Sequence, residues 1–260
     1  MAASRAVANL LWQLALRDFR QRFVGSILGW LWVVVHPLVL LGVYTFLFQY
    51  AFGARLPSEE ATGSYPLFLL SGLLPWLLLS ETLSRSAGSL TEHAALIRRT
   101  VFPSEAVPAS ILASTALGHL IALAALLAAA VLLGQVPKGS LALLPVWLGL
   151  LALLTLGLSW IAAALHVYLR DTAHVLRIIL IGWFWATPVF LPEAFYRERF
   201  GAVLEWNPAR YAVLGYRSAI LGGEPPSLSQ AASLLAFAVA AFFAGGLLFR
   251  HARKGFPDVI

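Results

Sequence analysis

The sequence contains no cysteine and carries little charge. Among its 260 residues only 12% are charged, whereas 60% are hydrophobic. The missing cysteines exclude a disulfide framework, a thiol nucleophile and a Cys-ligated metal site. A soluble domain is about half apolar and about a quarter charged. The apolar excess therefore indicates a chain whose surroundings include lipid.

The sequence also lacks the motifs of ATP hydrolysis and of metal-dependent catalysis. The nearest approach to the P-loop pattern runs from Gly134 to Ser140 and has no lysine before its serine. The aspartates Asp18, Asp171 and Asp258 are far apart, and the histidines show no metal-ligand spacing such as H-E-x-x-H. We therefore expect no catalytic residue, metal or cofactor in this chain, and we expect a separate subunit to hydrolyse any ATP.

Six apolar stretches predict six membrane-spanning helices. Most of them reach the roughly 20 residues that a helix needs to cross about 30 Å of hydrocarbon. The fifth is short, because its apolar run extends only from Ile178 to Leu191. The six stretches are 31–53, 66–86, 107–133, 141–168, 175–191 and 228–249.

The segment 192–227 mixes charged and aromatic residues between the last two apolar stretches. We interpret it as short helical pieces that re-enter the membrane from the outer side. Such breaks persist at depth only where they are buried in protein or line a wet cavity. Because the chain shows no internal repeat, we predict an all-α integral membrane protein with one membrane domain, 1–260, in which 31–249 is the membrane region.

The positions of the basic residues predict which side of the membrane each segment faces. Lys and Arg collect in cytoplasmic loops, and most of them here fall in 1–30, 87–106, 169–177 and 250–260. An even number of spans then places both termini in the cytoplasm. The net charge of +6 is accordingly interpreted as a sign of topology and not of nucleic-acid binding.

The N-terminal stretch, about 5–28, predicts an amphipathic helix that lies in the membrane surface. Trp12, Leu16, Phe19 and Phe23 share one face of such a helix. The arginines of this stretch can then reach lipid phosphates. An ordinary cytosolic helix is the alternative.

The cytoplasmic loop 91–105 predicts a short helix that can dock a cytosolic partner. Thr91 can cap this helix, Glu92 lies in its first turn, and Pro103 ends it. Two arginines near its last turn complement the helix dipole. A plain connector is the alternative. The candidate coupling residues are Glu92, Leu96, Ile97, Arg98 and Arg99.

Glu81, Arg85 and His119 are polar residues within the predicted spans. Glu81 and Arg85 are four residues apart, and this spacing lets them form an ion pair. Pairing lowers the cost of holding charge in a membrane helix, so the two residues are either a gate or a structural pair near the inner headgroups. For His119, near the middle of the third stretch, a hydrogen bond to a neighbouring helix is favoured over a role in a pore.

Aromatic residues within the spans are candidate substrate contacts. Their rings stack well on the C–H faces of sugars, and shallow contacts let a polymer move on. Trp183 and Trp185 lie about 200° apart on a helix, so we expect one to face a pore and the other to pack against a neighbouring helix. Packing against lipid or core is the alternative for each ring. The candidate channel residues are Tyr44, Phe48, Trp76, Trp183, Trp185 and Phe190.

Short motifs are spread over nearly the whole chain. The first is RDFRQRFVGSILGWLW at 17–32, followed by HPL at 36–38. The others are SGLLPW at 71–76, FPSEAVP at 102–108, YLRD at 168–171, FWATP at 184–188 and WNP at 206–208. In this order they resemble the ABC-2 type permeases that export bacterial polysaccharides.

The resemblance implies a homodimeric permease of the inner membrane with six spans per chain. It implies a coupling helix in the first cytoplasmic loop, re-entrant helices before the last span, and two copies of a separate P-loop ATPase that binds ATP and Mg²⁺. The implied cargo is a lipid-linked O-antigen or capsular glycan, with wall teichoic acid as the Gram-positive analogue. Only the resemblance supplies polysaccharide as the substrate.

Two alternatives remain open from the sequence. One is an ABC-2 exporter of a drug or a small lipid. The other is a membrane enzyme that acts on polyprenyl-linked sugars, which should carry clustered acidic residues at the inner face; this sequence lacks them.

Overall fold

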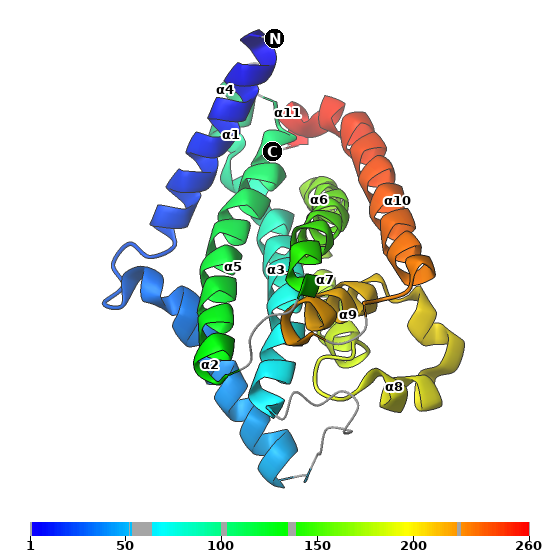
Figure 1. Ribbon diagram of the computed structural model, residues 1–260. Coiled ribbons are helices and arrows are strands. Elements are labelled where there is room, and N and C mark those ends of the chain that lie inside the picture. The colour runs from blue at the N-terminus through cyan, green and yellow to red at the C-terminus, as the bar shows by residue number, and fades with distance from the viewer. Residues whose placement is uncertain are drawn as a thin grey trace.

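A computed structural model describes residues 2–51, 53, 64–99, 103–134, 139–222 and 225–259. Within these ranges all regular structure is helical, and no strand is present. The long helices form a bundle with both termini at the same end (Figure 1). The prediction of an all-α chain is confirmed.

The bundle contains long helices and several short ones. The α-helices are α1 (Ala2–Gln21), α2 (Trp32–Thr45), α3 (Tyr65–Glu92), α4 (Ala94–Arg99), α5 (Ala106–Leu132), α6 (Leu144–Tyr168), α7 (Thr172–Trp185), α8 (Glu193–Phe200), α9 (Pro208–Leu221), α10 (Leu228–Ala252) and α11 (Phe256–Val259). The 3-10 helices are η1 (Gly29–Leu31), η3 (Gly139–Leu143), η4 (Gly201–Trp206) and η5 (Arg253–Gly255), and η2 (Phe46–Ala51) is a π-helix that continues α2.

Five helical stretches among the described residues are long and apolar enough to cross a membrane. They are Gly29–Ala51, Tyr65–Glu92, Ala106–Leu132, Ser140–Tyr168 and Leu228–Gly255, and each matches one predicted stretch. The remaining stretch, predicted at 175–191, contains α7, whose 14 residues extend only about 21 Å. The helix ends at Trp185 because Pro188 has no amide hydrogen to continue it.

α3 is the centre of the bundle. Nearly all of its length is buried, and α5, α6, α7 and α9 pack around it (Figure 1). The apolar stretch Gly29–Ala51, in contrast, buries very few of its residues within this chain. Its exposed apolar side chains therefore face lipid or another protein surface.

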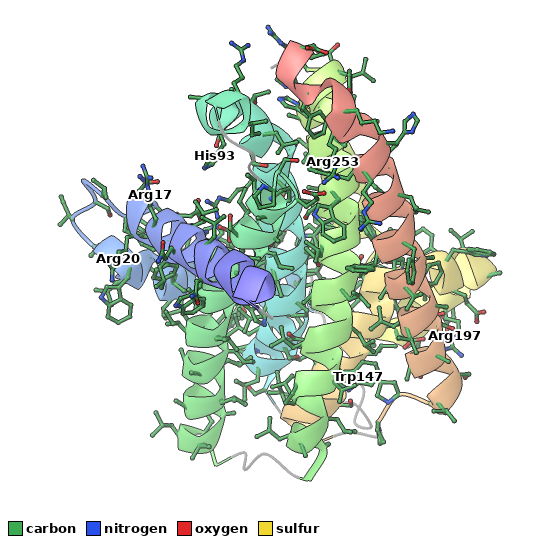
Figure 2. The ribbon with its side chains drawn as sticks, turned by 90° about the horizontal axis from the view of Figure 1, so that it is seen from above. Arg17, Arg20, His93, Trp147, Arg197 and Arg253 are labelled. Atoms are coloured by element: carbon green, nitrogen blue, oxygen red, sulfur yellow. The ribbon has the colours of Figure 1, made fainter. Side chains whose placement is uncertain are left out.

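α1 lies against α5 and ends earlier than the sequence predicted. The expected helix extended to about residue 28, but α1 ends at Gln21, and the chain turns through Gly25 and Gly29. Both glycines have positive φ values, of 80° and 52°, which side chains with a Cβ rarely adopt. Arg17 and Arg20 point away from the bundle (Figure 2), as expected for residues on the solvent or headgroup side.

α8, η4 and α9 confirm that 192–227 consists of short helical pieces. α9 is buried although it carries two arginines. Arg210 pairs with Glu193 of α8, and Arg217 donates a 2.6 Å hydrogen bond to the carbonyl of Val189. The guanidinium of Arg217 also lies 3.6 Å from the ring centroid of Phe68. These partners supply the compensation that a buried cation requires.

Candidate substrate cavity

The predicted channel aromatics of α2 and α7 come together in the structure. Phe190 lies at the centre of this group, which we call the aromatic cluster. Its ring centroid is 4.7 Å from that of Tyr44, 4.7 Å from Phe48, 4.9 Å from Phe184 and 5.1 Å from Trp185. Such offset and edge contacts are favourable aromatic geometry.

Phe190 itself is not on a helix, contrary to the prediction that placed it on the fifth span. It follows the end of α7 in the segment 186–192, where Thr187 and Pro188 break the helical pattern. The Phe190 ring is 1% exposed, and its carbonyl accepts a 3.1 Å hydrogen bond from Tyr65 of α3. The non-helical segment is thus fixed by the bundle.

The two neighbouring tryptophans of α7 have different environments. Trp183 donates a 2.7 Å hydrogen bond from its indole nitrogen to the side-chain oxygen of Asn207, the residue that caps α9. Its ring is also 5.8 Å from that of Trp76. Trp185 is 50% exposed. One tryptophan therefore packs against its neighbours while the other is open to the surroundings.

A cavity of about 660 Å³ adjoins the aromatic cluster, between α2, α3, α5 and α7 and the residues that follow α1. Phe184 belongs to both, and its ring lies 5.4 Å from that of Trp76, which also lines the cavity. The other predicted channel residues, Tyr44, Phe48, Trp183, Trp185 and Phe190, are not among its lining residues.

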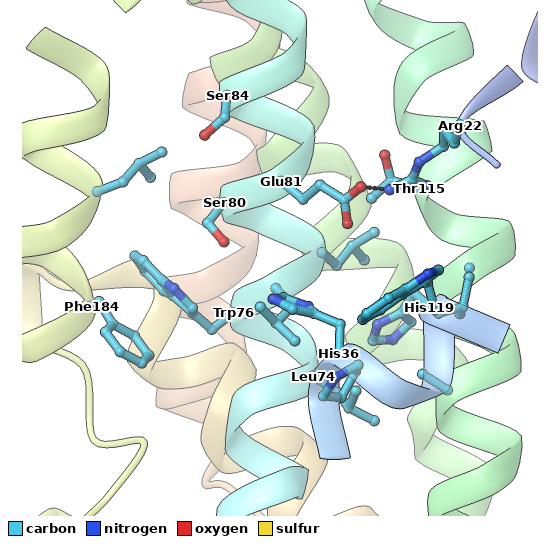
Figure 3. A pocket seen from close by; sticks show the side chains of 18 of the residues that line it. Arg22, His36, Leu74, Trp76, Ser80, Glu81, Ser84, Thr115, His119 and Phe184 are labelled. Carbon is cyan, nitrogen blue, oxygen red and sulfur yellow. Dashed lines mark ion pairs between the residues drawn. The ribbon is translucent and has the colours of Figure 1, made fainter. Parts of the chain in front are cut away.

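The cavity has an aromatic part and a polar part. Figure 3 shows Trp76 and Phe184 together, with Ser80, Ser84 and Glu81 further along α3. A site that offers flat rings beside hydroxyl and charged groups suits a ligand with both apolar faces and hydrogen-bonding edges.

Glu81 and Arg85 do not form the predicted ion pair with each other. Glu81 pairs instead with Arg22, beyond the end of α1, and Arg85 makes a 2.6 Å ion pair with Asp18 of α1. The four residues therefore join α1 to α3. The sequence pattern predicted a local pair because it could not include α1, whose packing on α5 brings Asp18 and Arg22 within reach of α3.

Arg22 is partly buried at the edge of the cavity. Burial lowers its pKa to about 10, and the neighbouring Arg85 also lowers it, whereas Asp18 raises it. The guanidinium therefore stays charged at neutral pH and can neutralise Glu81.

His119 forms a hydrogen bond to a neighbouring helix, as the sequence analysis favoured. Its Nε2 lies 3.0 Å from the hydroxyl of Tyr216 on α9, and the two rings are 5.6 Å apart. His119 also lines the cavity, so the helix contact and the cavity wall share this residue.

The predicted coupling loop contains a short helix, α4, but its capping differs from the prediction. Thr91 and Glu92 belong to the last turn of α3, and the hydroxyl of Thr91 donates to the carbonyl of Gly88. Glu92 is therefore not in the first turn of the short helix. The predicted stop at Pro103 follows residues 100–102, which lie outside the described part of the chain.

The candidate coupling residues fall into three groups. Ile97 is buried against a small apolar cluster that includes Val107, Phe249 and Phe256, so it cannot offer its side chain to a partner. Arg98 and Glu92 are exposed. The side chains of Leu96 and Arg99 lie outside the described residues.

Several residues of the site were not among the sequence candidates. Arg22 was visible only as part of a basic N-terminal stretch, and Asp18 only as one of three isolated aspartates. Phe184 was not chosen because it stands between two tryptophans in the sequence. Its spacing of seven residues from Arg177 would have placed both residues on one helical face, and both line the cavity. Asn207 carried the clearest signal, because Asn before Pro208 is a typical helix start.

Comparison with known proteins gives a consistent result over most of the chain. A family model described as ABC-2 type transporter matches residues 9–221. The O-antigen export system permease protein RfbA of Myxococcus xanthus is 28% identical over 254 residues, which cover 97% of this chain and 95% of the relative. A Klebsiella pneumoniae protein of the same name is 26% identical, covering 83% and 81%. The polysialic acid transport protein KpsM of Escherichia coli is 28% identical, covering 91% of each.

Proposed function

Because the chain belongs to the ABC-2 type transporter family, we propose that it is the membrane channel subunit of an exporter that moves a lipid-linked polysaccharide out of the cytoplasm. The proposed cargo is an O-antigen or a capsular polysaccharide, because similar proteins are named for O-antigen export and for polysialic acid transport. The similarity extends over nearly the full length of both chains, so it includes the membrane path as well as the docking elements.

The structural observation that carries this proposal is the aromatic cluster beside the partly polar cavity. Tyr44, Phe48 and Trp185 each place a ring against the buried ring of Phe190, and these three rings are themselves at least partly exposed. A polymer crossing the bilayer needs contacts weak enough to leave, as in other conducting paths. Repeated shallow stacking on rings satisfies that condition without selecting one sugar at each step.

A second copy of the chain completes the channel in this proposal. α2 and α7 carry many exposed apolar side chains, among them Val39, Val43 and Ile178, each at least half exposed. The exposed Trp185 lies seven residues after Ile178 and therefore on the same face of α7. A dimer through the exposed faces of α2 and α7 would enclose the aromatic cluster between two chains. Such a homodimer would have two-fold symmetry, which is the commonest symmetry of protein dimers.

A separate ATPase supplies the energy. The chain has no P-loop, so two copies of a P-loop subunit would bind ATP and Mg²⁺ and would dock at the end that holds α4 and α11 (Figure 1). That end then faces the cytoplasm with both termini. The exposed Arg98 of α4 is the best placed of the described coupling candidates.

The topology that fits this arrangement has six passes. α7 would complete the sixth crossing together with the buried segment 186–192, and α8 to α9 would re-enter from the outer side. Burial of Arg210 and Arg217 beside protein partners supports a position at membrane depth, since irregular backbone is tolerated there only inside protein.

Export by the reconstituted system tests the proposal. A strain lacking its own polysaccharide permease should regain surface polysaccharide when this chain is expressed with its cognate ATPase. The purified chain alone should hydrolyse no ATP above a mock preparation. Export of a small drug at the same rate, with no polysaccharide at the surface, would point to the drug or small-lipid alternative instead.

A further inference from the structure

Three side chains of α3 form a column along the cavity wall. Trp76, Ser80 and Ser84 are spaced by four residues, so they share one face of the helix. Figure 3 shows them one above another on the side of α3 that faces Phe184 of α7. Within the described part of the chain, neither serine hydroxyl has a hydrogen-bond partner. Both hydroxyls are therefore available to a ligand.

A matching column on α7 faces the cavity. Phe184, Ile181 and Arg177 are spaced by three and four residues and all line the cavity. α3 and α7 run in opposite directions. Phe184 near the end of α7 contacts Trp76 in the middle of α3, and Phe190, which follows α7, accepts a hydrogen bond from Tyr65 at the start of α3. The Phe184 to Trp76 contact therefore fixes how the two columns align.

The alignment places Arg177 at the level of the two serines. Ser84 lies eight residues beyond Trp76, a rise of about 12 Å, and Arg177 lies seven residues before Phe184, a rise of about 11 Å. Both displacements lead away from the aromatic part. The polar part of the cavity thus combines one guanidinium from α7 with two hydroxyls from α3.

Arg177 has an unusual charge environment. The cavity is lined by one other arginine, Arg22, and that residue is already paired with Glu81. Arg177 is exposed to the cavity and, among the described residues, has no carboxylate or carbonyl partner. An exposed guanidinium that faces a polar cavity and has no carboxylate beside it is suited to bind an anion.

We propose that Arg177, Ser80 and Ser84 form a binding site for the phosphate group of the lipid-linked substrate. The guanidinium offers a planar fork of donors that matches phosphate oxygens, and the hydroxyls supply two further donors. Glu81 does not oppose this, because Arg22 neutralises it. The sugars next to the phosphate would then lie along Trp76 and Phe184. This inference rests on the proposed function and deepens it by naming the part of the substrate that is recognised.

Binding of a sugar-free polyprenyl diphosphate to the purified full-length chain, in nanodiscs of phosphatidylcholine, tests the inference. Loss of a charge-assisted contact should weaken binding about ten- to a hundredfold in Arg177→Gln. Arg177→Lys should fall between this variant and the wild type, because the charge remains and the fork is lost. Ser80→Ala combined with Ser84→Ala should weaken binding several-fold. Arg250→Gln, which changes an exposed arginine of α10 outside the cavity, should bind as the wild type does.

Two further probes distinguish the source of the anion. Inorganic diphosphate and a lipid-free oligosaccharide carrying carboxylates are titrated into the same variants. The proposal is overturned if Arg177→Gln binds the polyprenyl diphosphate as well as the wild type does, or if only the acidic oligosaccharide depends on Arg177. Restored polysaccharide export by the wild type tests the proposed function separately. Failure of the phosphate site and failure of the proposed function can therefore be distinguished.

Discussion

At the scale of single residues, Trp183 and Trp185 illustrate how neighbouring rings acquire different roles. Trp183 donates to Asn207 and contacts Trp76, so Trp183→Ala should lower the amount of folded protein and its melting temperature. Loss of a large aromatic from such packing costs about 3–5 kcal/mol when the site is fully buried, and somewhat less for this half-buried ring. Trp185→Ala should leave the melting temperature nearly unchanged and reduce export.

Both variants are compared by detergent thermal unfolding and by surface polysaccharide per molecule of inserted protein. Trp183→Phe serves as a control, because it keeps one aromatic ring in the packing while it removes the indole donor. Export that is normal in Trp185→Ala, after correction for protein amount, would contradict a channel role for that ring.

At the scale of helix pairs, the crossing of α6 and α10 depends on glycine. A Cβ at Gly157 would collide with the backbone of Ala241 and Phe242, and Gly245 faces Gly157 across the same contact. Gly157→Ala should therefore force the helices apart and destabilise the fold by about 1–3 kcal/mol. Gly149→Ala is a matched control on α6, because a Cβ there meets nothing within 4 Å.

The two glycine variants are compared by thermal unfolding of the purified chain. Alanine is a better helix former than glycine by about 1 kcal/mol, so Gly149→Ala should be neutral or slightly stabilising. Equal melting temperatures for the two variants would show that the close approach of α6 and α10 does not limit stability.

The docking element gives a prediction at the same scale. Arg98 of α4 is exposed, whereas the adjacent Ile97 is buried against Val107 and Phe249. Arg98→Glu should leave the chain inserted and folded but should reduce polysaccharide export and ATPase stimulation in the complex. Ile97→Asp should instead reduce folded protein, because it buries a carboxylate without a partner. Co-purification with the ATPase and turnover of the complex measure the two effects, and normal coupling in Arg98→Glu would remove this residue from the docking surface.

Sequence patterns predicted the elements well and the contacts between them less well. Apolar runs located the five long spans and the short α7, because lipid contact demands continuous hydrophobicity. The end of α7 was misplaced, since apolar residues continue to Leu191 while Thr187 and Pro188 interrupt the helix. The Glu81 and Arg85 pairing was wrong because local spacing cannot include a distant helix. The convergence of Tyr44, Phe48 and Phe190 follows from tertiary packing, which no local period encodes.

At the scale of the whole molecule, the absence of cysteine makes the topology directly measurable. Single cysteines introduced into this chain have no native thiol background. Arg98 and Lys254 are exposed at the end that holds both termini, and Glu198 of α8 is exposed at the opposite end (Figure 1). In intact spheroplasts, a membrane-impermeant maleimide should label Glu198→Cys and should leave Arg98→Cys and Lys254→Cys unmodified. Permeabilised cells should label all three. This pattern is expected because Lys and Arg concentrate near the terminal end, and because the proposed exporter requires its ATPase to dock there. Labelling of Lys254→Cys from outside would show that the chain has the opposite orientation. α4 would then face away from the cytoplasmic ATP and could not serve as the docking helix.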